Sequence, residues 1–238
     1  MIRFYAPDIT TTHALPESDS GHAVRVLRMH AGDELQVVDG SGNVYTCRLL
    51  DENNRHAAVE ILDAHAQPPA WDFRLTVMVA PTKSMDRMEW LVEKLVEIGI
   101  NAFIPVRCER SERKDINTSR LIKIAASAMK QSLKATLPQI SPMTALADAL
   151  KQTEATQRFM GYCSESVQRR LLSTSLKPEA DTAILIGPEG DFTAREVELA
   201  VDAGFIPVTM GNNRLRTETA ALVGVDTCHI INQLATSI

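Results

Sequence analysis

The sequence has little of what a metal, disulfide or membrane site needs. Its 4 cysteines are scattered without a C-x-x-C pair, which favours free thiols over a disulfide framework. Its 6 histidines show no ligand spacing, so we expect no metal. No stretch approaches the ~20 apolar residues of a bilayer span, and the amino end has no apolar run of signal-peptide length. These absences predict a cytoplasmic protein with no membrane partner.

Two phosphate-binding fingerprints are also absent. The chain contains neither G-x-G-x-x-G nor G-x-x-x-x-G-K-[ST], so a Rossmann or P-loop cradle is not expected. The net charge of -5 argues mildly against a nucleic-acid partner. Basic residues nevertheless gather between positions 107 and 134. Composition alone favours a solvated helix face for them, and a patch that follows a phosphate backbone is the alternative. They are Arg107, Arg110, Arg113, Lys114, Arg120, Lys123, Lys130 and Lys134.

The most informative stretch lies near the carboxyl end, from Ala183 to Leu222. An apolar strand over 183–186 is followed by the loop GPEGDF, and Thr193 with Glu196 predicts a capping-box helix start. A second strand over 205–210 leads into the loop 211–216, and Thr217 is expected to cap a final helix reaching about residue 234. Two glycine-bearing loops are thus predicted at the carboxyl ends of two adjacent strands, where open α/β sheets bind ligands.

The rest of the chain reads as two parts. Short strands over 2–5, 35–38, 44–50 and 56–62 predict a small β-barrel, and 22–29 fits either a helix or a strand. The proline pair in 66–70 predicts a linker. Beyond it, strands alternate with helices, which predicts an α/β domain with a mostly parallel sheet. The expected domains are 1–67 and 72–238. The expected elements of the second part are strands at 74–80, 102–106 and 159–163 and helices at 85–98, 118–133 and 144–150.

The two loops carry a family resemblance. IGPEGDF followed by MGNNRLRTETA resembles the paired signature of the RsmE family of SPOUT methyltransferases, with Asp191 in place of a second glycine and Met210 in place of leucine. HAVRVLRMHAGDELQVVDGSG is similar to the pattern of the family's PUA-like domain. PTKSMDRMEWLVEKLVEIGI and ERSERK resemble two further blocks, and in AMKQSLKATLP Lys130 and Lys134 replace a usual glutamate and arginine.

The resemblance implies a fold and an activity. The fold would be an α/β trefoil-knot domain preceded by a PUA-like β-barrel that binds RNA. The protein would be a homodimer that uses S-adenosyl-L-methionine to methylate N3 of a uridine in 16S ribosomal RNA, free or within the 30S subunit. The implied cofactor-binding residues are Ile186, Gly187, Pro188, Glu189, Gly190, Met210, Gly211, Leu215, Arg216, Thr217, Thr219 and Ala220. The implied RNA contacts are Arg25, Arg28, Lys83, Arg110, Arg113, Lys130 and Lys134.

The chemistry of N3 methylation suggests two catalytic residues, Arg216 and Glu218. Loss of the N3 proton places negative charge on the uracil oxygens, and an arginine stays charged to stabilise it. A salt bridge between Arg216 and Glu218 is an equally good interpretation of that arginine. Glu189 and Glu97 follow Glu218 as candidate proton acceptors. Two other functions remain open: a non-catalytic RNA-binding protein of the same fold, and an unrelated α/β enzyme that binds a phosphorylated ligand.

Overall fold

A computed structural model of the chain describes residues 2–164 and 168–236. The chain divides into two compact units, one of residues 1–71 and 125–137 and the other of residues 72–124 and 138–238. Segment 125–137, expected in the second domain, thus clusters with the first unit. Backbone hydrogen bonds explain this: Gly42 N donates to Ala135 O at 3.0 Å, and Leu137 N donates to Gly40 O at 2.8 Å.

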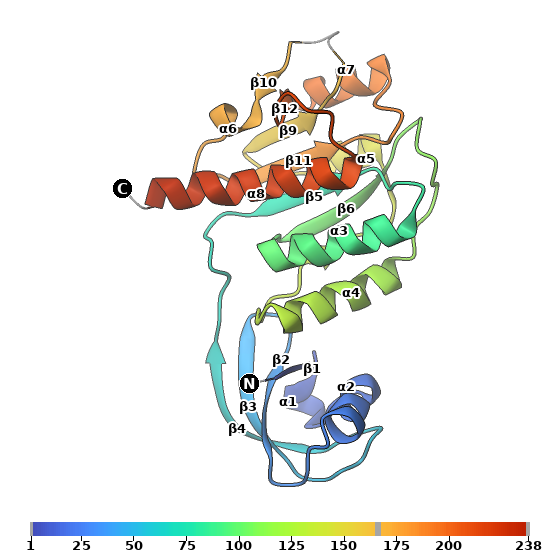
Figure 1. Cartoon of the computed structure of the whole chain (residues 1–238). Coiled ribbons are helices and arrows are strands. Elements are labelled where there is room, and N and C mark those ends of the chain that lie inside the picture. Colours follow the sequence, from blue (N-terminus) through green and yellow to red (C-terminus); the bar gives the residue numbers. More distant parts are fainter. Residues whose placement is uncertain (1, 165–167, 237–238) are drawn as a thin grey trace. The chain divides into compact units, whose positions relative to one another are not determined.

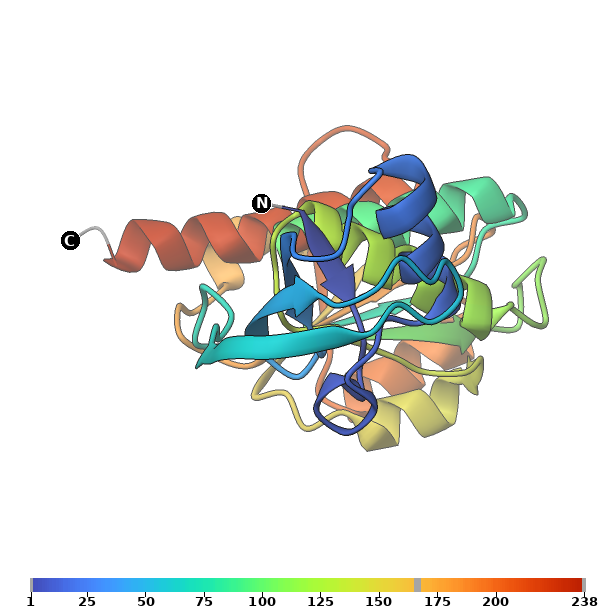
Figure 2. The ribbon, with the colours of Figure 1, turned by 90° about the horizontal axis from the view of Figure 1, so that it is seen from below.

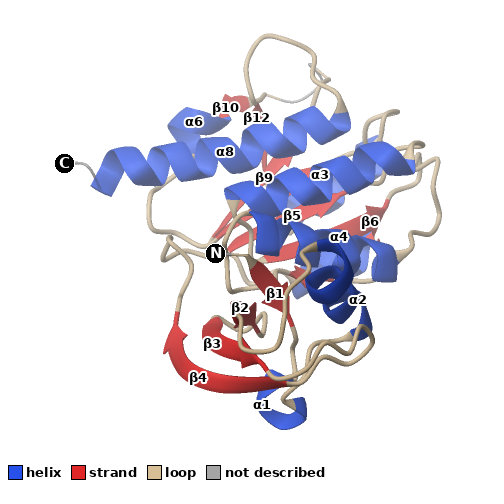
Figure 3. Cartoon of the chain, turned by 60° about the horizontal axis from the view of Figure 1, so that its bottom comes forward, coloured by secondary structure: helices blue, strands red, loops and turns tan. Residues whose placement is uncertain are grey.

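The first unit is built on a four-stranded sheet with the order β1-β2-β3-β4. Its strands are β1 (Arg3–Tyr5), β2 (Glu34–Val38), β3 (Asn43–Leu49) and β4 (Val59–Ala66), the last drawn as a long curved strand in Figure 3. β1 pairs parallel with β2, and the other two pairings are antiparallel. The helical segments are α1 (Ile9–Thr12), α2 (Glu17–Gly21) and a π-helical turn over His22–Val26. This turn resolves the helix-or-strand alternative for 22–29.

A partly buried ion pair anchors the end of helix α4 (Thr118–Gln131) in the first unit. Lys130 Nζ lies 2.6 Å from Asp19 Oδ1, and Asp19 is 3% exposed. The other carboxylate oxygen of Asp19 accepts a hydrogen bond from Tyr5 N at 2.8 Å. The ammonium of Lys130, predicted as an RNA contact, is therefore engaged by a carboxylate inside this unit.

The second unit is an α/β structure whose sheet has the order β10-β12-β9-β11-β5-β6-β7, with β8 also pairing to β6. Every strand pairing in it is parallel among the described residues. In chain order, α4 aside, the elements are β5 (Leu75–Val79), α3 (Met85–Ile98), β6 (Ala102–Arg107), β7 (Gln139–Ile140), β8 (Thr144–Ala145), α5 (Leu146–Gln152), β9 (Gln157–Gly161), β10 (Arg170–Leu171), α6 (Leu172–Ser175), β11 (Thr182–Ile186), α7 (Ala194–Asp202), β12 (Ile206–Thr209) and α8 (Thr217–Thr236).

Helices cover both faces of this sheet. α3 and α8 lie side by side on one face, and α5 and α7 cover the other (Figures 1 and 2). Alternate strand residues such as Met78 and Leu185 pack with Leu146 of α5 and Val197 of α7 in one buried cluster. On the α8 side, a Cβ at Gly224 would lie 3.2 Å from Ile184 Cδ1, so glycine lets the helix approach the sheet closely.

Two expectations about this unit are corrected. β11 and β12 are not adjacent, because β9 pairs in parallel with both of them and lies between. Thr144 and Ala145, expected at the start of a helix, form the short strand β8, which pairs with β6 before α5 begins at Leu146. The mixed α/β fold with a parallel sheet is confirmed.

Candidate active site

The first glycine loop leaves β11 and enters α7 through the predicted capping box. Thr193 Oγ1 accepts from Glu196 N at 3.3 Å, and Glu196 Oε2 accepts from Thr193 N at 2.9 Å. A Cβ at Gly187 would lie 2.7 Å from Phe192 Cε2, so the buried Phe192 ring occupies the space beside Gly187. Asp191 has a φ of 59°. This left-handed conformation explains a glycine at that position in the family pattern, and aspartate tolerates it better than most residues.

The second loop leaves β12 and enters α8. Gly211 has a φ of 132°, and a Cβ there would meet no atom within 4 Å, so the backbone of this loop borders open space. Thr217, expected as the helix cap, is instead the first residue of α8. Its hydroxyl donates to Gly187 O at 3.3 Å, which joins the two loops across the intervening strand.

Gly161, at the end of β9, lets the residues before the two loops converge. A Cβ on Gly161 would lie 2.8 Å from Ile186 Cδ1 and 3.2 Å from Met210 Cε. The side chains of Ile186 and Met210, which precede the first and second loops, therefore meet over Gly161, which has no side chain. This places the two predicted cofactor loops around one centre, although their strands are not neighbours.

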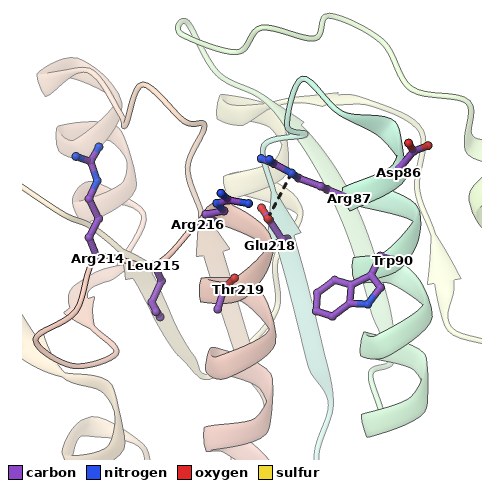
Figure 4. A pocket seen from close by; sticks show the side chains of 8 residues that line it. All are labelled: Asp86, Arg87, Trp90, Arg214, Leu215, Arg216, Glu218 and Thr219. Atoms are coloured by element: carbon purple, nitrogen blue, oxygen red, sulfur yellow. Dashed lines mark ion pairs between the residues drawn. The ribbon is translucent and has the colours of Figure 1, made fainter.

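An open pocket of about 610 Å³ lies beside the second loop. One wall is the start of α3, and the other is the second loop with the start of α8 (Figure 4). Three arginines and one tryptophan are among its lining residues, which are Asp86, Arg87, Trp90, Arg214, Leu215, Arg216, Glu218 and Thr219. Both predicted catalytic residues, Arg216 and Glu218, thus lie in the same pocket.

Glu218 is the most unusual side chain of this pocket. The residue is 7% exposed, and its Oε2 is buried with no hydrogen-bond partner in the described chain. Its Oε1 lies 3.7 Å from Arg87 Nε, and Arg87 Nη1 lies 3.6 Å from Glu189 Oε1 of the first loop. A buried acceptor left unsatisfied costs about 1–3 kcal/mol, which is compensated when a ligand donates to it. Glu218 therefore lines the pocket with a carboxylate that has one acceptor position filled by no described residue.

The ion pair of Glu218 with Arg87 bears on the alternative interpretation of Arg216. Glu218 forms an ion pair with a guanidinium from α3, and no ion pair joins it to the exposed Arg216 among the described residues. Glu97, the third candidate proton acceptor, lies in the last turn of α3 with its Oε1 2.8 Å from Lys94 Nζ. The pocket is at the other end of that helix, so Glu97 is not among its lining residues.

The predicted RNA contacts do not form one group. Arg25 and Arg28 are exposed in the first unit, and Lys130 and Lys134 also belong to it. Lys83, Arg110 and Arg113 belong to the second unit. There, Arg110 Nη1 donates to Gly190 O at 3.0 Å, and Arg113 Nε donates to Lys83 O at 2.9 Å. These two arginines thus hold loop backbone, and Arg110 supports the first glycine loop directly.

Arg87 and Trp90 are pocket residues that the sequence reasoning missed. Both lie on α3; Arg87 is partly exposed, and Trp90 is exposed. Two features of the sequence could have identified them. They are three residues apart, which puts them on the same side of a helix, and the tryptophan lies outside the apolar stripe of that helix. Among the described residues, no group of histidine, cysteine and carboxylate side chains could hold a metal ion. No helix in that part of the chain is long and apolar enough to span a membrane.

Comparison with known proteins places this geometry in a family. A family model described as an RNA methyltransferase domain matches residues 69–228, and one described as an RNA methyltransferase PUA domain matches residues 15–62. A Synechocystis protein named ribosomal RNA small subunit methyltransferase E is 27% identical over 222 residues, covering 91% of this chain and 72% of that protein.

Two solved structures are similar over almost the whole chain. A probable rRNA methyltransferase from Porphyromonas gingivalis is 41% identical with a TM-score of 0.93, covering 99% of this chain and 100% of that one. A ribosomal RNA small subunit methyltransferase E from Neisseria gonorrhoeae bound to S-adenosyl methionine is 27% identical with a TM-score of 0.85, covering 97% and 98%. The chain therefore belongs to the RsmE family of RNA methyltransferases.

Proposed function

We propose that the protein transfers the methyl group of S-adenosyl-L-methionine to N3 of a uridine in 16S ribosomal RNA of the small subunit. The observation that carries this proposal is the joining of the two glycine loops beside a pocket that holds Arg216 and the unpartnered carboxylate oxygen of Glu218. The relative from Neisseria gonorrhoeae was solved with this cofactor, and the Synechocystis relative is named for the same RNA class.

The residues of the two loops fit S-adenosyl-L-methionine. The open backbone at Gly211 lets a ligand approach without meeting a side chain, and Leu215 and Thr219 offer apolar and hydroxyl contacts at the pocket. Neither loop is a phosphate cradle, which suits a cofactor without phosphate groups. We assign the cofactor to the residues predicted from the sequence, which are Ile186, Gly187, Pro188, Glu189, Gly190, Met210, Gly211, Leu215, Arg216, Thr217, Thr219 and Ala220. When bound, the cofactor supplies a methyl group already activated on a sulfonium sulfur.

The protein's own residues must then deal with the N3 proton. Uracil N3–H is weakly acidic, so the site has to accept this proton and stabilise the negative charge that spreads onto O2 and O4. In our proposal Glu218 accepts the proton at its carboxylate, whose Oε2 has no hydrogen-bond partner among the described residues. Arg216, exposed in the same pocket, faces the uracil oxygens, where its permanent positive charge stabilises the transition state more than the ground state.

Arg87 has a positioning role in this scheme. Its guanidinium lies near Oε1 of Glu218 and near Glu189 of the first loop. Because Arg87 holds Oε1, the carboxylate of Glu218 cannot rotate freely. The direction of its other oxygen, Oε2, is then fixed as well. Glu189, whose side chain is 43% exposed, is the weaker candidate for a proton acceptor because water can satisfy its oxygens.

We propose two functional domains, residues 1–67 and residues 72–238. We assign RNA binding mainly to the first of them. Arg25 lies in the π-helical turn, and Arg28 follows it with a φ of 55°. Such turns and left-handed non-glycine residues concentrate at functional sites. Both arginines are exposed, as phosphate contacts require. The engaged ammonium of Lys130 makes that residue the weakest of the predicted RNA contacts.

Three further features belong to the same proposal. The protein acts as a homodimer; Ile230 and Leu234, four residues apart on α8, are 46% and 60% exposed and offer an apolar stripe to a second copy. α8 passes through a preceding loop to form the trefoil knot that the family resemblance implies. Because its proposed substrate is ribosomal RNA, we also propose that the protein acts in the cytoplasm.

A matched pair of arginine substitutions tests the mechanism. Arg214 and Arg216 are both exposed, both line the pocket and lie two residues apart. Replacing Arg216 by alanine should lower kcat about 10²–10³-fold, as loss of one oxyanion-stabilising donor does. Arg214→Ala should leave kcat close to that of the unchanged protein. The affinity for S-adenosyl-L-methionine, measured by isothermal titration, should be the same for the unchanged protein and both variants. If Arg216→Ala, like Arg214→Ala, kept the kcat of the unchanged protein, Arg216 would have no role in the mechanism.

A further inference from the structure

The start of α3 forms a wall of the pocket that contains no predicted cofactor residue. Asp86, Arg87 and Trp90 make up this wall, whereas Leu215, Arg216 and Thr219 on the facing wall belong to the predicted cofactor set. The pocket thus has a cofactor side and a second side. A methyltransferase needs a place for the acceptor next to its methyl donor, and the α3 wall is where this pocket has room for one.

Trp90 gives that wall a flat aromatic surface. The residue is 43% exposed, and in Figure 4 its indole ring extends from α3 toward the facing wall. The apolar side chains of the same helix at Met88, Leu91 and Val92 are buried, so the exposure of Trp90 is not a general feature of α3. A ring held at the edge of a pocket offers a stacking surface to a nucleobase.

The polar groups around this ring match one base edge. Uracil carries an N3–H donor between two carbonyl acceptors. The pocket is lined by the carboxylate residue Glu218, whose buried Oε2 has no partner among the described residues, and by the arginine donors Arg216 and Arg87. Cytosine and adenine present a ring nitrogen acceptor at the equivalent edge, which would face the carboxylate and be repelled. An aromatic face combined with this order of acceptor and donors therefore favours a base with a ring N–H beside a carbonyl, as in uracil, over cytosine and adenine.

We propose that Trp90 is the platform on which the target uracil stacks, so that N3 of the base is presented to Glu218 and Arg216. This inference rests on the proposed function and adds the acceptor subsite to it. Trp90 contacts the substrate ring in this arrangement. Arg87, one turn before it on α3, keeps the carboxylate of Glu218 directed at the base edge.

Photo-crosslinking tests the contact directly. An RNA with 5-iodouridine at the methylated position is bound to the protein in the presence of S-adenosylhomocysteine and irradiated, and crosslinked peptides are identified by mass spectrometry. A crosslink on Trp90 supports the proposal. If the protein methylates the same RNA but crosslinks only at other residues, or not at all, the Trp90 proposal is wrong. The proposed function is unaffected by that result. Failure of the unchanged protein to methylate any uridine would contradict the proposed function itself.

Steady-state kinetics supply the second measurement. Stacking on an aromatic side chain contributes about 1–3 kcal/mol per base, so Trp90→Ala should raise the KM for RNA about 5- to 140-fold. Trp90→Phe should restore most of this loss, and cofactor affinity should not change. Leu199→Ala is the matched control, because Leu199 is 40% exposed on α7 and lies outside the pocket. If Trp90→Ala instead converts a dimer into monomers in sedimentation experiments, a second copy covers the ring and the proposal is wrong.

Discussion

The contact between Gly187 and Phe192 makes a quantitative prediction about the first glycine loop. An alanine at position 187 would place its Cβ 2.7 Å from Cε2 and 3.0 Å from Cδ2 of Phe192. Carbon atoms do not approach so closely, and Phe192 is only 2% exposed, so its ring has little room to move. Overpacking of this kind costs about 1–3 kcal/mol. For a chain of this size that corresponds to a lower melting temperature, by about 2–4 °C per kcal/mol.

The same substitution should also weaken cofactor binding. Gly187 O accepts the hydroxyl of Thr217, so a displaced loop separates the two cofactor segments. We expect Gly187→Ala to show both a lower melting temperature in calorimetry and a weaker Kd for S-adenosyl-L-methionine. Gly190→Ala is the control from the same loop, because its Cβ would meet Arg110 Cβ at 3.4 Å, an ordinary contact. Its melting temperature should stay close to that of the unchanged protein.

A second-site change separates the steric cause from other causes. Phe192→Leu removes part of the ring that collides with the new methyl group, so the pair Gly187→Ala with Phe192→Leu should be more stable than the sum of the two single changes predicts. Strict additivity of the two changes, or equal melting temperatures for Gly187→Ala and Gly190→Ala, would refute the reasoning.

Three other predictions follow from particular contacts. Asp191→Gly should leave stability and activity nearly unchanged because glycine accepts the left-handed backbone, whereas Asp191→Val should destabilise the protein by about 1–2 kcal/mol in urea titrations; equal effects would contradict this. Lys130→Met leaves Asp19 buried without its partner and should cost about 3–5 kcal/mol in the same titration, while Lys123→Met on the exposed side of α4 should be nearly neutral. Burial raises the pKa of the Cys47 thiol to about 11 and that of Cys228 to about 12, so at pH 8 their thiolate fractions are very small. Cys163, which is exposed, should therefore react first with a thiol reagent. Rapid labelling of Cys47 in the folded protein would count against this.

The sequence predicted much of the local structure because the signals were local. The helix expected over 85–98 is observed with the same bounds, and its buried residues include Met88, Leu91 and Leu95. The capping box at Thr193 and Glu196 forms as expected. Periodicity and capping chemistry depend on neighbours three or four residues away, so one sequence contains them in full.

The errors concern contacts between distant residues. Nothing in the pattern shows that β9 lies between β11 and β12, because strand order is decided by packing of the whole sheet. The pairing of Lys130 with Asp19, 111 residues away, was equally hidden, and it changes the meaning of a lysine in a basic stretch. Arg87 and Trp90 belong to the pocket only because α3 lies beside α8.

Labelled methyl transfer tests the central claim most directly. Small ribosomal subunits from cells that lack the gene are incubated with the purified protein and S-adenosyl-L-methionine carrying a deuterated methyl group. The account predicts one labelled 3-methyluridine in the 16S ribosomal RNA, found by nucleoside mass spectrometry and absent with the Arg216→Ala protein. A label on another atom or base, or full labelling by the Arg216→Ala protein, would contradict it.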